Sequence, residues 1–281
     1  MKRLIWFVKQ SLILDYKFFQ VSKWSFFKKV EFIFKKYQIL AYHSFRKFEL
    51  GKDFANLSGQ KLYYGNRFGI ADYQGVLARH QKLLRIANFK ISKKGVFIDV
   101  GANVGIVSKL IRDLYPVIPI YGVEPVPDIF ACFRKNFGED LNTHIFNIAL
   151  DMVKGKQRML FSNQNSEISR IDKKGNIAVN AETLDTFIKK NKITNIDLLK
   201  IDTEGFEDKV LLGAKEALSK ARYLFVEVTL KNNPNYTLSY LMSLLSSKEY
   251  NFNLVAFRNF GDTSEGEAPI LDCLMKNVRL P

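Results

Sequence analysis

Apolar runs alternate with amphipathic stretches along the chain from residue 96 onward. A short, continuous apolar run is typical of a strand that is buried on both faces, and the stretches between the runs repeat apolar residues at helical spacing. We expect strands at VFIDV (96–100), PIYGVE (119–124), THIFNIAL (143–150), IDLLKID (196–202) and RYLFVEV (222–228), and helices at 105–115, 127–137, 183–191 and 207–220. The pattern predicts an α/β fold in which helices cover both faces of a mostly parallel sheet.

The end of the chain breaks this alternation. A helical pattern at 237–250 is followed by two apolar runs, FNLVAF (252–257) and ILDCLMK (270–276), which are joined by a turn-rich segment. Two strands without an intervening helix predict an antiparallel hairpin, here at one edge of the sheet.

The first 90 residues follow a third pattern, so we divide the chain into a helical N-terminal extension (1–90) and an α/β domain (91–281). The segment KWSFFKKVEFIFKKYQIL (23–40) predicts an amphipathic helix, preceded by another. Its apolar face holds Phe27, Val30, Phe34 and Tyr37, and another face holds Lys28, Lys29, Lys35 and Lys36. The glycine-rich residues 51–72 predict a loop or short hairpin, and residues 73–89 a helix.

Positive charge is concentrated in this extension. The chain of 281 residues has a net charge of +15; residues 1–50 hold 11 basic and 3 acidic residues (+8), and the other 231 hold 32 and 25 (+7). No uncharged apolar run is long enough for a membrane span, and the basic start has no small-residue cleavage site, so we expect neither a span nor a signal peptide. Cys132 and Cys273 lie in unrelated contexts, which fits a reducing, cytoplasmic location, and three scattered histidines argue against a histidine metal centre.

The loop after the first core strand carries the clearest chemical signal. Its pattern is Asp99-x-Gly101-x-Asn103-x-Gly105. Asn103 and Ile106 stand where a dinucleotide fingerprint has glycines, and Asp99 would repel a pyrophosphate. A tight strand-to-helix turn without a ligand is the structural alternative.

A ligand with cationic groups fits this loop better. The methionyl end of S-adenosylmethionine carries an ammonium beside a carboxylate and a sulfonium. The glycines allow close backbone approach, and the start of the next helix offers amides to an anion. Glu124, which ends the second core strand, is placed to accept hydrogen bonds from both ribose hydroxyls. We therefore predict S-adenosylmethionine as the cofactor.

Several motifs together resemble a known family. FIDVGANVG, VEPVPDIFACFRKNF, NIAL, ETLDTF, LLKIDTEGFEDKVLLGA and YLFVEV occur in order between about residues 95 and 276. They are similar to the FkbM-type methyltransferases of the class I S-adenosylmethionine-dependent group. The resemblance implies a Rossmann-like, seven-stranded sheet ending in a reversed hairpin, and methyl transfer to a hydroxyl of a sugar or natural product. It does not extend to residues 1–90.

Acidic residues lie at or near the carboxyl ends of four predicted strands. If the strand order is that of the class, Asp99, Glu124, Asp202 and Glu227 share one edge of the sheet, where ligands of open α/β sheets bind. Such a cluster suits a cationic cosubstrate. We expect Asn147 and Ala149, after the third strand, to lie beside the adenine ring.

Asp202 and Glu204 are the predicted catalytic residues. A sugar hydroxyl gains from a base that removes its proton, and we assign that role to Asp202 and acceptor orientation to Glu204. One alternative is that Asp202 or Thr203 only caps the helix near Glu207. Another is a divalent cation on the two acids, but no third ligand is evident, so we predict no metal. In the polar segment 162–176, Ser166, Glu167, Ser169 and Arg170 are candidates for binding a glycan, and a solvated connection is an equal alternative.

The leading functional hypothesis is O-methylation of a saccharide, glycolipid or related small molecule in polysaccharide biosynthesis. An RNA methyltransferase fits the positive charge but not the acidic edge, so nucleic acid is disfavoured. A non-catalytic domain that binds S-adenosylmethionine is a further alternative. For residues 1–50 we weigh a helical cap with its aromatic residues packed on the core, peripheral contact with an anionic membrane at its inner face, and nucleic-acid binding. The sequence does not predict the oligomeric state.

Overall fold

The structure is a computed structural model of the whole chain. It describes residues 11–280 apart from 14, 17, 21–24, 46–47, 58–59, 66–72, 75, 77–79, 81, 86, 93–94, 162–169, 230–236 and 261–269.

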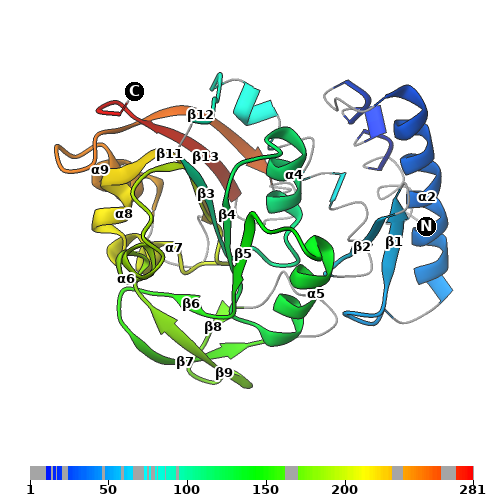
Figure 1. Cartoon of the computed structure of the whole chain (residues 1–281), viewed down its shortest axis with the longest axis horizontal. Coiled ribbons are helices and arrows are strands. Elements are labelled where there is room, and N and C mark those ends of the chain that lie inside the picture. The colour runs from blue at the N-terminus through cyan, green and yellow to red at the C-terminus, as the bar shows by residue number, and fades with distance from the viewer. Residues whose placement is uncertain are drawn as a thin grey trace.

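A seven-stranded sheet forms the centre of the molecule (Figure 1). Its order is β12-β13-β11-β10-β3-β4-β5, and β13 is antiparallel to both of its neighbours while the other pairs are parallel. The strands are β3 (Val96–Val100), β4 (Ile120–Val123), β5 (Thr143–Phe146), β10 (Ile196–Ile201), β11 (Ala221–Thr229), β12 (Phe252–Phe260) and β13 (Ile270–Asn277). The predicted α/β class, the mostly parallel sheet and the reversed hairpin are confirmed.

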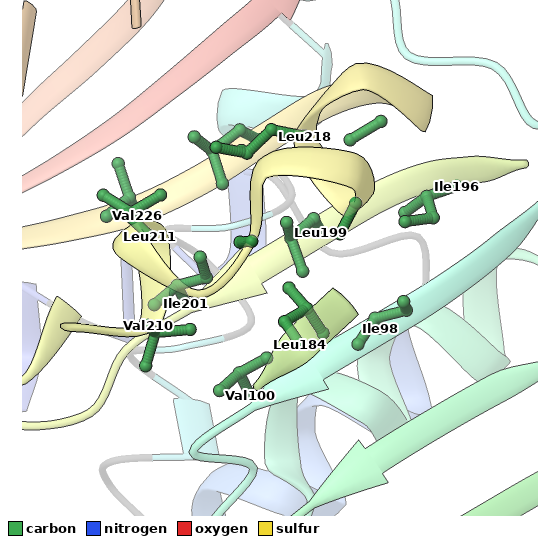
Figure 2. Close-up of a cluster of buried hydrophobic side chains, with 14 of the residues drawn as sticks. Ile98, Val100, Leu184, Ile196, Leu199, Ile201, Val210, Leu211, Leu218 and Val226 are labelled. Atoms are coloured by element: carbon green, nitrogen blue, oxygen red, sulfur yellow. The ribbon is translucent and has the colours of Figure 1, made fainter. Parts of the chain in front are cut away.

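Helices cover both faces of this sheet, with α4 (Ile106–Leu114) and α5 (Pro127–Phe137) on one side in Figure 1. The other side holds α6 (Leu184–Lys190), α7 (Glu207–Leu212), α8 (Lys215–Lys220) and α9 (Leu238–Leu245). Successive side chains of β3 point to opposite faces of the sheet and pack against the helices on each side. Phe97 packs with Ile111 of α4, whereas Ile98 joins the cluster with Leu184 and Leu211 on the opposite face (Figure 2).

The strand order places the switch point between β3 and β10. From β3 the chain moves outward to β4 and β5, then returns to β10 and β11 on the other side. Loops that leave the carboxyl ends of β3 and β10 therefore run in opposite directions. Open α/β sheets bind ligands at such a switch point, and we refer to this edge as the crevice.

A second, small sheet was not predicted. The run at 143–150 divides, so that β5 stays in the main sheet and β6 (Ala149–Leu150) pairs with β9 (Ile177–Glu182). With β7 (Gly155–Leu160) and β8 (Arg170–Ile171) these strands form a sheet of order β6-β9-β7-β8. β7 and β9 mix exposed with buried positions and include polar residues, and so lack the apolar runs on which the prediction was based.

The single helix expected at 207–220 is two helices, α7 and α8, separated at Gly213. A Cβ on Gly213 would lie 2.4 Å from the carbonyl oxygen of Asp151, so the chain makes a close approach there that only glycine permits. The carboxylate of Asp185 in α6 accepts hydrogen bonds from the amides of Glu216 (3.0 Å) and Ala217 (2.9 Å). These bonds satisfy free amides at the start of α8 and allow a new helix to begin.

The N-terminal extension packs against the α4–α5 side. It contains α2 (Phe26–Phe45) and the predicted hairpin, formed by β1 (Phe54–Leu57) and β2 (Gln60–Tyr63). Asn136 of α5 exchanges two hydrogen bonds with the backbone of Tyr63, at 2.7 and 2.8 Å. Leu110 of α4 joins the buried cluster of the extension.

The face of α2 that packs on the molecule differs from the one expected. Phe32, Lys36 and Leu40 are buried, whereas the predicted packing face is exposed and includes Phe27 and Phe34. Lys36 is buried because its ammonium pairs with the Asp15 carboxylate and donates to polar groups of neighbouring segments.

Candidate functional site

The loop between β3 and α4 (residues 101–105) is shaped by left-handed backbone conformations. φ is +69° at Gly101 and +52° at Asn103, which are residue types that tolerate this region. The amides of Gly101 and Ala102 donate to the carbonyl oxygen of Val123, and the amide of Asn103 donates to the Glu124 carboxylate at 3.0 Å. These three amides are thus committed inside the protein.

Two positions of this loop need glycine for space as well as for φ. A Cβ on Gly101 would lie 1.9 Å from the carbonyl oxygen of Asp202. A Cβ on Gly105, where φ is +83°, would lie 2.3 Å from the ring of Phe133. The loop is therefore packed between the end of β10 and helix α5, and its position depends on both.

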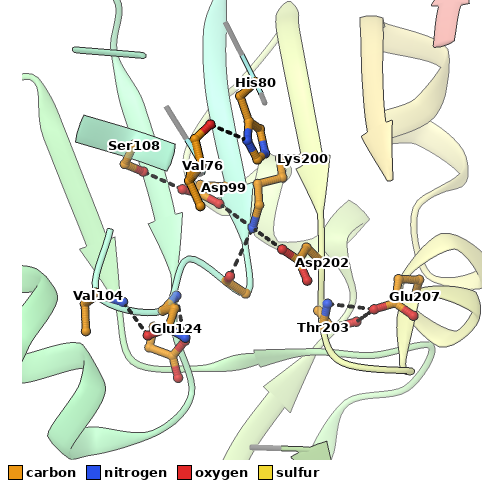
Figure 3. Close-up of polar contacts among 12 residues, drawn as sticks. Val76, His80, Asp99, Val104, Ser108, Glu124, Lys200, Asp202, Thr203 and Glu207 are labelled. Atoms are coloured by element: carbon orange, nitrogen blue, oxygen red, sulfur yellow. Dashed lines mark hydrogen bonds and ion pairs between the residues drawn. The ribbon is translucent and has the colours of Figure 1, made fainter. Parts of the chain in front are cut away.

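Asp99 does not face the open side of this loop. Its carboxylate is fully buried, accepts a hydrogen bond from the Ser108 hydroxyl at 2.6 Å, and forms an ion pair with the Lys200 ammonium at 3.1 Å (Figure 3). We expected this carboxylate to contact the cofactor's cationic groups. In the structure Ser108 and Lys200 contact the carboxylate in place of the cofactor, and no surface of Asp99 is exposed to a ligand.

Lys200 is the central residue that the sequence analysis missed. Its ammonium is buried at the end of β10, lies 3.1 Å from Asp99 and 3.3 Å from Asp202, and donates a hydrogen bond of 3.1 Å to the carbonyl oxygen of Gly101. Burial alone would lower the pKa of Lys200, but the two carboxylates outweigh it and raise the pKa, so the lysine stays charged. A lysine inside the apolar run IDLLKID was the available signal, since buried lysines need partners.

Glu124 lies at the end of β4 beside the loop. Its carboxylate accepts hydrogen bonds from the amides of Asn103 (3.0 Å) and Val126 (2.9 Å). Burial raises the pKa of Glu124 to about 7, against the lowering effect of these amides and of Lys200. A carboxylate has about four lone-pair positions. The two amides use two of them, and the side chain is otherwise buried, with 5% of the residue exposed.

The two residues expected near the adenine ring lie in different surroundings. Asn147 is exposed, and its amide group donates to the carbonyl oxygens of Glu124 (2.9 Å) and Pro125 (2.8 Å), so it holds the chain that follows β4. Ala149 is buried in β6 within an apolar cluster that includes Val126. The cofactor contact of Asn147 stays a prediction, whereas the side chain of Ala149 is covered by protein.

Three carboxylates meet at the ends of β10 and β11. One oxygen from each of Asp202, Glu204 and Glu227 lies within 4.8 Å of the others. Burial, followed by the charges of Asp202 and Glu204, raises the pKa of Glu227 to about 10. The cluster therefore favours a positive charge or a bound proton. Glu227 is the third carboxylate that the sequence analysis had not joined to Asp202 and Glu204, so three oxygen donors that could hold a hard divalent cation lie together.

The capping alternative for Asp202 or Thr203 is wrong. Phe206 is the N-cap of α7, and no side chain caps it. Instead, Glu207 reaches back: its Oε1 accepts from the amide (2.7 Å) and hydroxyl (3.1 Å) of Thr203 and from the amide of Gly205 (3.2 Å). Burial raises the pKa of Glu207. Glu207 thus fixes the turn that carries Glu204, which has a φ of +57°.

The predicted acceptor segment is mostly outside the described residues. Ser166, Glu167 and Ser169 lie there, and of Arg170 only the backbone, in β8, is described. Their role stays a prediction.

The residues of this edge fit S-adenosylmethionine. The acceptor positions that the two amides leave unused on Glu124 match a ribose diol, and the carboxylates at the ends of β10 and β11 favour cationic groups at the same edge of the sheet. Asp202 and Gly101 are in close contact through the backbone, so both halves of the crevice form one unit.

Comparison with known proteins agrees with this geometry. Residues 99–254 match the family described as the methyltransferase FkbM domain. Among curated proteins, the chain is 26% identical over 206 residues to the 2-O-methyltransferase NoeI of Sinorhizobium fredii (strain NBRC 101917 / NGR234). The aligned region covers 66% of this chain and 80% of NoeI.

Solved structures give weaker likenesses. Methyltransferase FkbM from Methylobacillus flagellatus KT has a TM-score of 0.48 at 12% identity; the match covers 87% of this chain but 60% of that one. TrmK of M. capricolum, in complex with S-adenosyl-homocysteine, has a TM-score of 0.43 at 12% identity, with 70% and 68% covered. Because these TM-scores and identities are low, the family is assigned from the family match, which spans more than half of the chain. This protein belongs to the FkbM methyltransferase family, and its methyl donor is S-adenosylmethionine.

Proposed function

We propose that this methyltransferase acts on a hydroxyl group of a saccharide or glycolipid, in polysaccharide biosynthesis. The similarity to NoeI, which is named a 2-O-methyltransferase, supports oxygen as the acceptor atom. The carboxylates at the crevice support it independently, because a hydroxyl is a weak nucleophile and gains from a nearby base that removes its proton.

The observation that carries the proposal is the anchoring of Asp202. Its carboxylate is partly exposed and is held 3.3 Å from the buried Lys200 ammonium, which is itself fixed by Asp99. A base must be positioned within hydrogen-bonding reach of the proton that it accepts. The ion pair fixes one oxygen of Asp202 and leaves the other for the acceptor hydroxyl.

Glu204 and Glu227 complete this side of the crevice. Glu204 is exposed at the tip of the turn, where it hydrogen-bonds and orients the hydroxyls of the acceptor. S-adenosylmethionine supplies an electrophilic methyl group on a cationic sulfur. Glu227, buried behind the other two acids, keeps the local potential negative or holds a proton, and alignment of the acceptor with the methyl group supplies much of the rate.

The test begins with donor binding and then asks for transfer. Calorimetry with S-adenosylmethionine establishes that the purified chain binds its donor. Transfer of a labelled methyl group is then measured on panels of oligosaccharides, glycolipids and RNA. We expect transfer to a saccharide-containing panel, a loss of about 100-fold or more in Asp202→Asn, a smaller loss in Glu204→Gln, and donor binding retained in both.

A matched control is Glu139→Gln, an exposed acid on the α5 side of the molecule. Its activity should equal that of the wild type. Transfer to RNA alone would replace the proposal by RNA methylation, and donor binding without transfer to any panel would favour a non-catalytic role. Full activity in Asp202→Asn would remove Asp202 as the base.

A further inference from the structure

Helix α2 carries a stripe of large apolar side chains that faces away from the molecule. Exposed fractions are 82% for Phe27, 45% for Val30, 65% for Phe34 and 36% for Tyr37. Their spacing of three and four residues places them on one face of the helix, which we call the α2 stripe. Phe26, at the start of the helix, is 65% exposed beside it.

The stripe is exposed because the opposite side of α2 is fixed. Phe32 and Leu40 pack in the cluster of the extension, and between them the buried Lys36 pairs with Asp15 and donates to Gln74 at 3.1 Å. Turning the stripe inward would bring Lys36 out and leave the largely buried Asp15 without its cation. A buried charge that loses its partner strongly destabilises the fold.

Neighbouring residues enlarge the apolar surface. Tyr37 donates a hydrogen bond of 2.7 Å to Asp15, so the preceding helical segment runs beside α2. In that segment Leu12 and Tyr16 are also exposed. Single exposed apolar residues are normal, but a contiguous apolar surface marks a contact with another molecule or a membrane.

The net charge of the N-terminal segment selects the partner. Residues 1–50 have a net charge of +8. Each of their three acids has a basic partner: Asp15 pairs with Lys36, Glu31 with Lys35 at 2.5 Å, and Glu49 with Lys52 at 2.7 Å. Positive charge therefore remains in excess. A second copy of the same face would bring like charges together, whereas an anionic surface is complementary.

We propose that the α2 stripe docks on an anionic lipid surface. Phenylalanine and tyrosine side chains enter the boundary between headgroups and acyl chains, and exposed basic residues of the extension such as Lys28 contact lipid phosphates. The helix would lie along the membrane. Within the described part of the chain, no helix has the length and apolar character needed to cross one. This proposal does not depend on the acceptor of the methyl group.

Vesicle co-sedimentation of the full chain tests it. The protein is mixed with vesicles of phosphatidylcholine alone or of phosphatidylcholine with phosphatidylglycerol. We expect binding to the anionic vesicles, much weaker binding to the neutral ones, and weakening by salt. The double variant Phe27→Gln/Phe34→Gln should bind the anionic vesicles at least about tenfold more weakly, since two aromatic side chains no longer enter the lipid.

The matched control is Val117→Gln/Leu141→Gln, which removes two exposed apolar residues from the α/β domain. It should bind as the wild type does, and thermal melts should show both double variants folded. The proposal fails if the wild type does not bind anionic vesicles or if both double variants lose binding equally. It also fails if the stripe variant loses only self-association, seen by light scattering, or only RNA binding, seen by gel shift.

Discussion

Lys200 and Asp99 lie directly opposite each other in the pairing of β10 with β3, and their side chains form a fully buried ion pair with N···O of 3.1 Å. The same ammonium contacts Asp202 and the carbonyl oxygen of Gly101. One lysine therefore joins the first core strand, the loop that follows it, and the carboxylate that we propose as the base. Four predictions test this arrangement and its surroundings.

Replacing Lys200 should destabilise the fold and abolish methyl transfer. Lys200→Met leaves Asp99 as a buried charge without its cation, for which we expect a loss of about 3–5 kcal/mol in the free energy of unfolding. Urea unfolding measures it. Lys209→Met, which removes a part-exposed ion pair with Asp208, should cost about 1 kcal/mol or less.

A second substitution separates charge from packing. Adding Asp99→Asn to Lys200→Met removes the stranded charge, so part of the lost stability should return while methyl transfer stays absent, because Asp202 is no longer anchored. A Lys200→Met variant as stable as wild type would contradict the buried pair.

Donor binding should depend on the ionisation of Glu124. Its pKa is about 7 in the free protein, and the charged form is the better acceptor for ribose hydroxyls. Affinity should be constant well above pH 7 and fall by up to about tenfold per pH unit below it. Calorimetry across this range measures the effect. Glu124→Gln provides the reference for titration of the ligand itself and should bind weakly without the step, and Glu124→Ala should not bind. Wild-type affinity that follows the Glu124→Gln profile would contradict this role.

Glu227→Gln should stabilise the protein at neutral and alkaline pH. The folded pKa of about 10 exceeds that of an exposed glutamate, so this group favours folding most below about pH 4.5 and loses that contribution as pH rises toward 10. Glutamine has no such dependence. The variant's gain should be near zero at pH 4.5 and on the order of 1–3 kcal/mol at pH 7.

Thermal melts over a pH series measure this gain. Repeating the melts with Mg²⁺ distinguishes the two ways to neutralise the carboxylates: a bound cation would raise the melting temperature of the wild type more than that of Glu227→Gln. A constant difference between the two proteins at every pH would contradict a buried, shared charge.

The backbone of the loop should not tolerate Gly101→Ala. The substitution combines a φ of +69° with a Cβ only 1.9 Å from the carbonyl oxygen of Asp202, so we expect a loss of at least about 2 kcal/mol and weaker donor binding. Gly155→Ala is the control: nothing lies within 4 Å of its Cβ, and its stability should stay within about 1 kcal/mol of the wild type. Chemical denaturation of both variants decides. If Gly101→Ala were as stable as Gly155→Ala, the loop would not be packed tightly against the end of β10.

Part of the site was predictable because strand ends define it. Asp202 and Glu124 follow apolar runs, and parallel strands bring their carboxyl ends to one edge, so their shared location could be predicted once the strand order of the class was assumed. The direction in which each side chain points does not. Asp99 is one residue before the end of β3, on the side that α4 covers, and Ser108 of that helix accounts for one of its contacts.

The sequence by itself determined the order and type of the main-sheet elements and the family, because strands buried on both faces must be apolar along their whole length and glycines mark the turns between them. The tertiary structure alone decided the small four-stranded sheet, the partner of Asp99 and the buried face of α2. Each depends on groups far apart in the chain: Lys200 reaches Gly101 across 99 residues, and Lys36 meets Gln74 across 38. A local pattern shows that a lysine or an apolar stripe is present, but only the segments packed against it determine which of the two is buried.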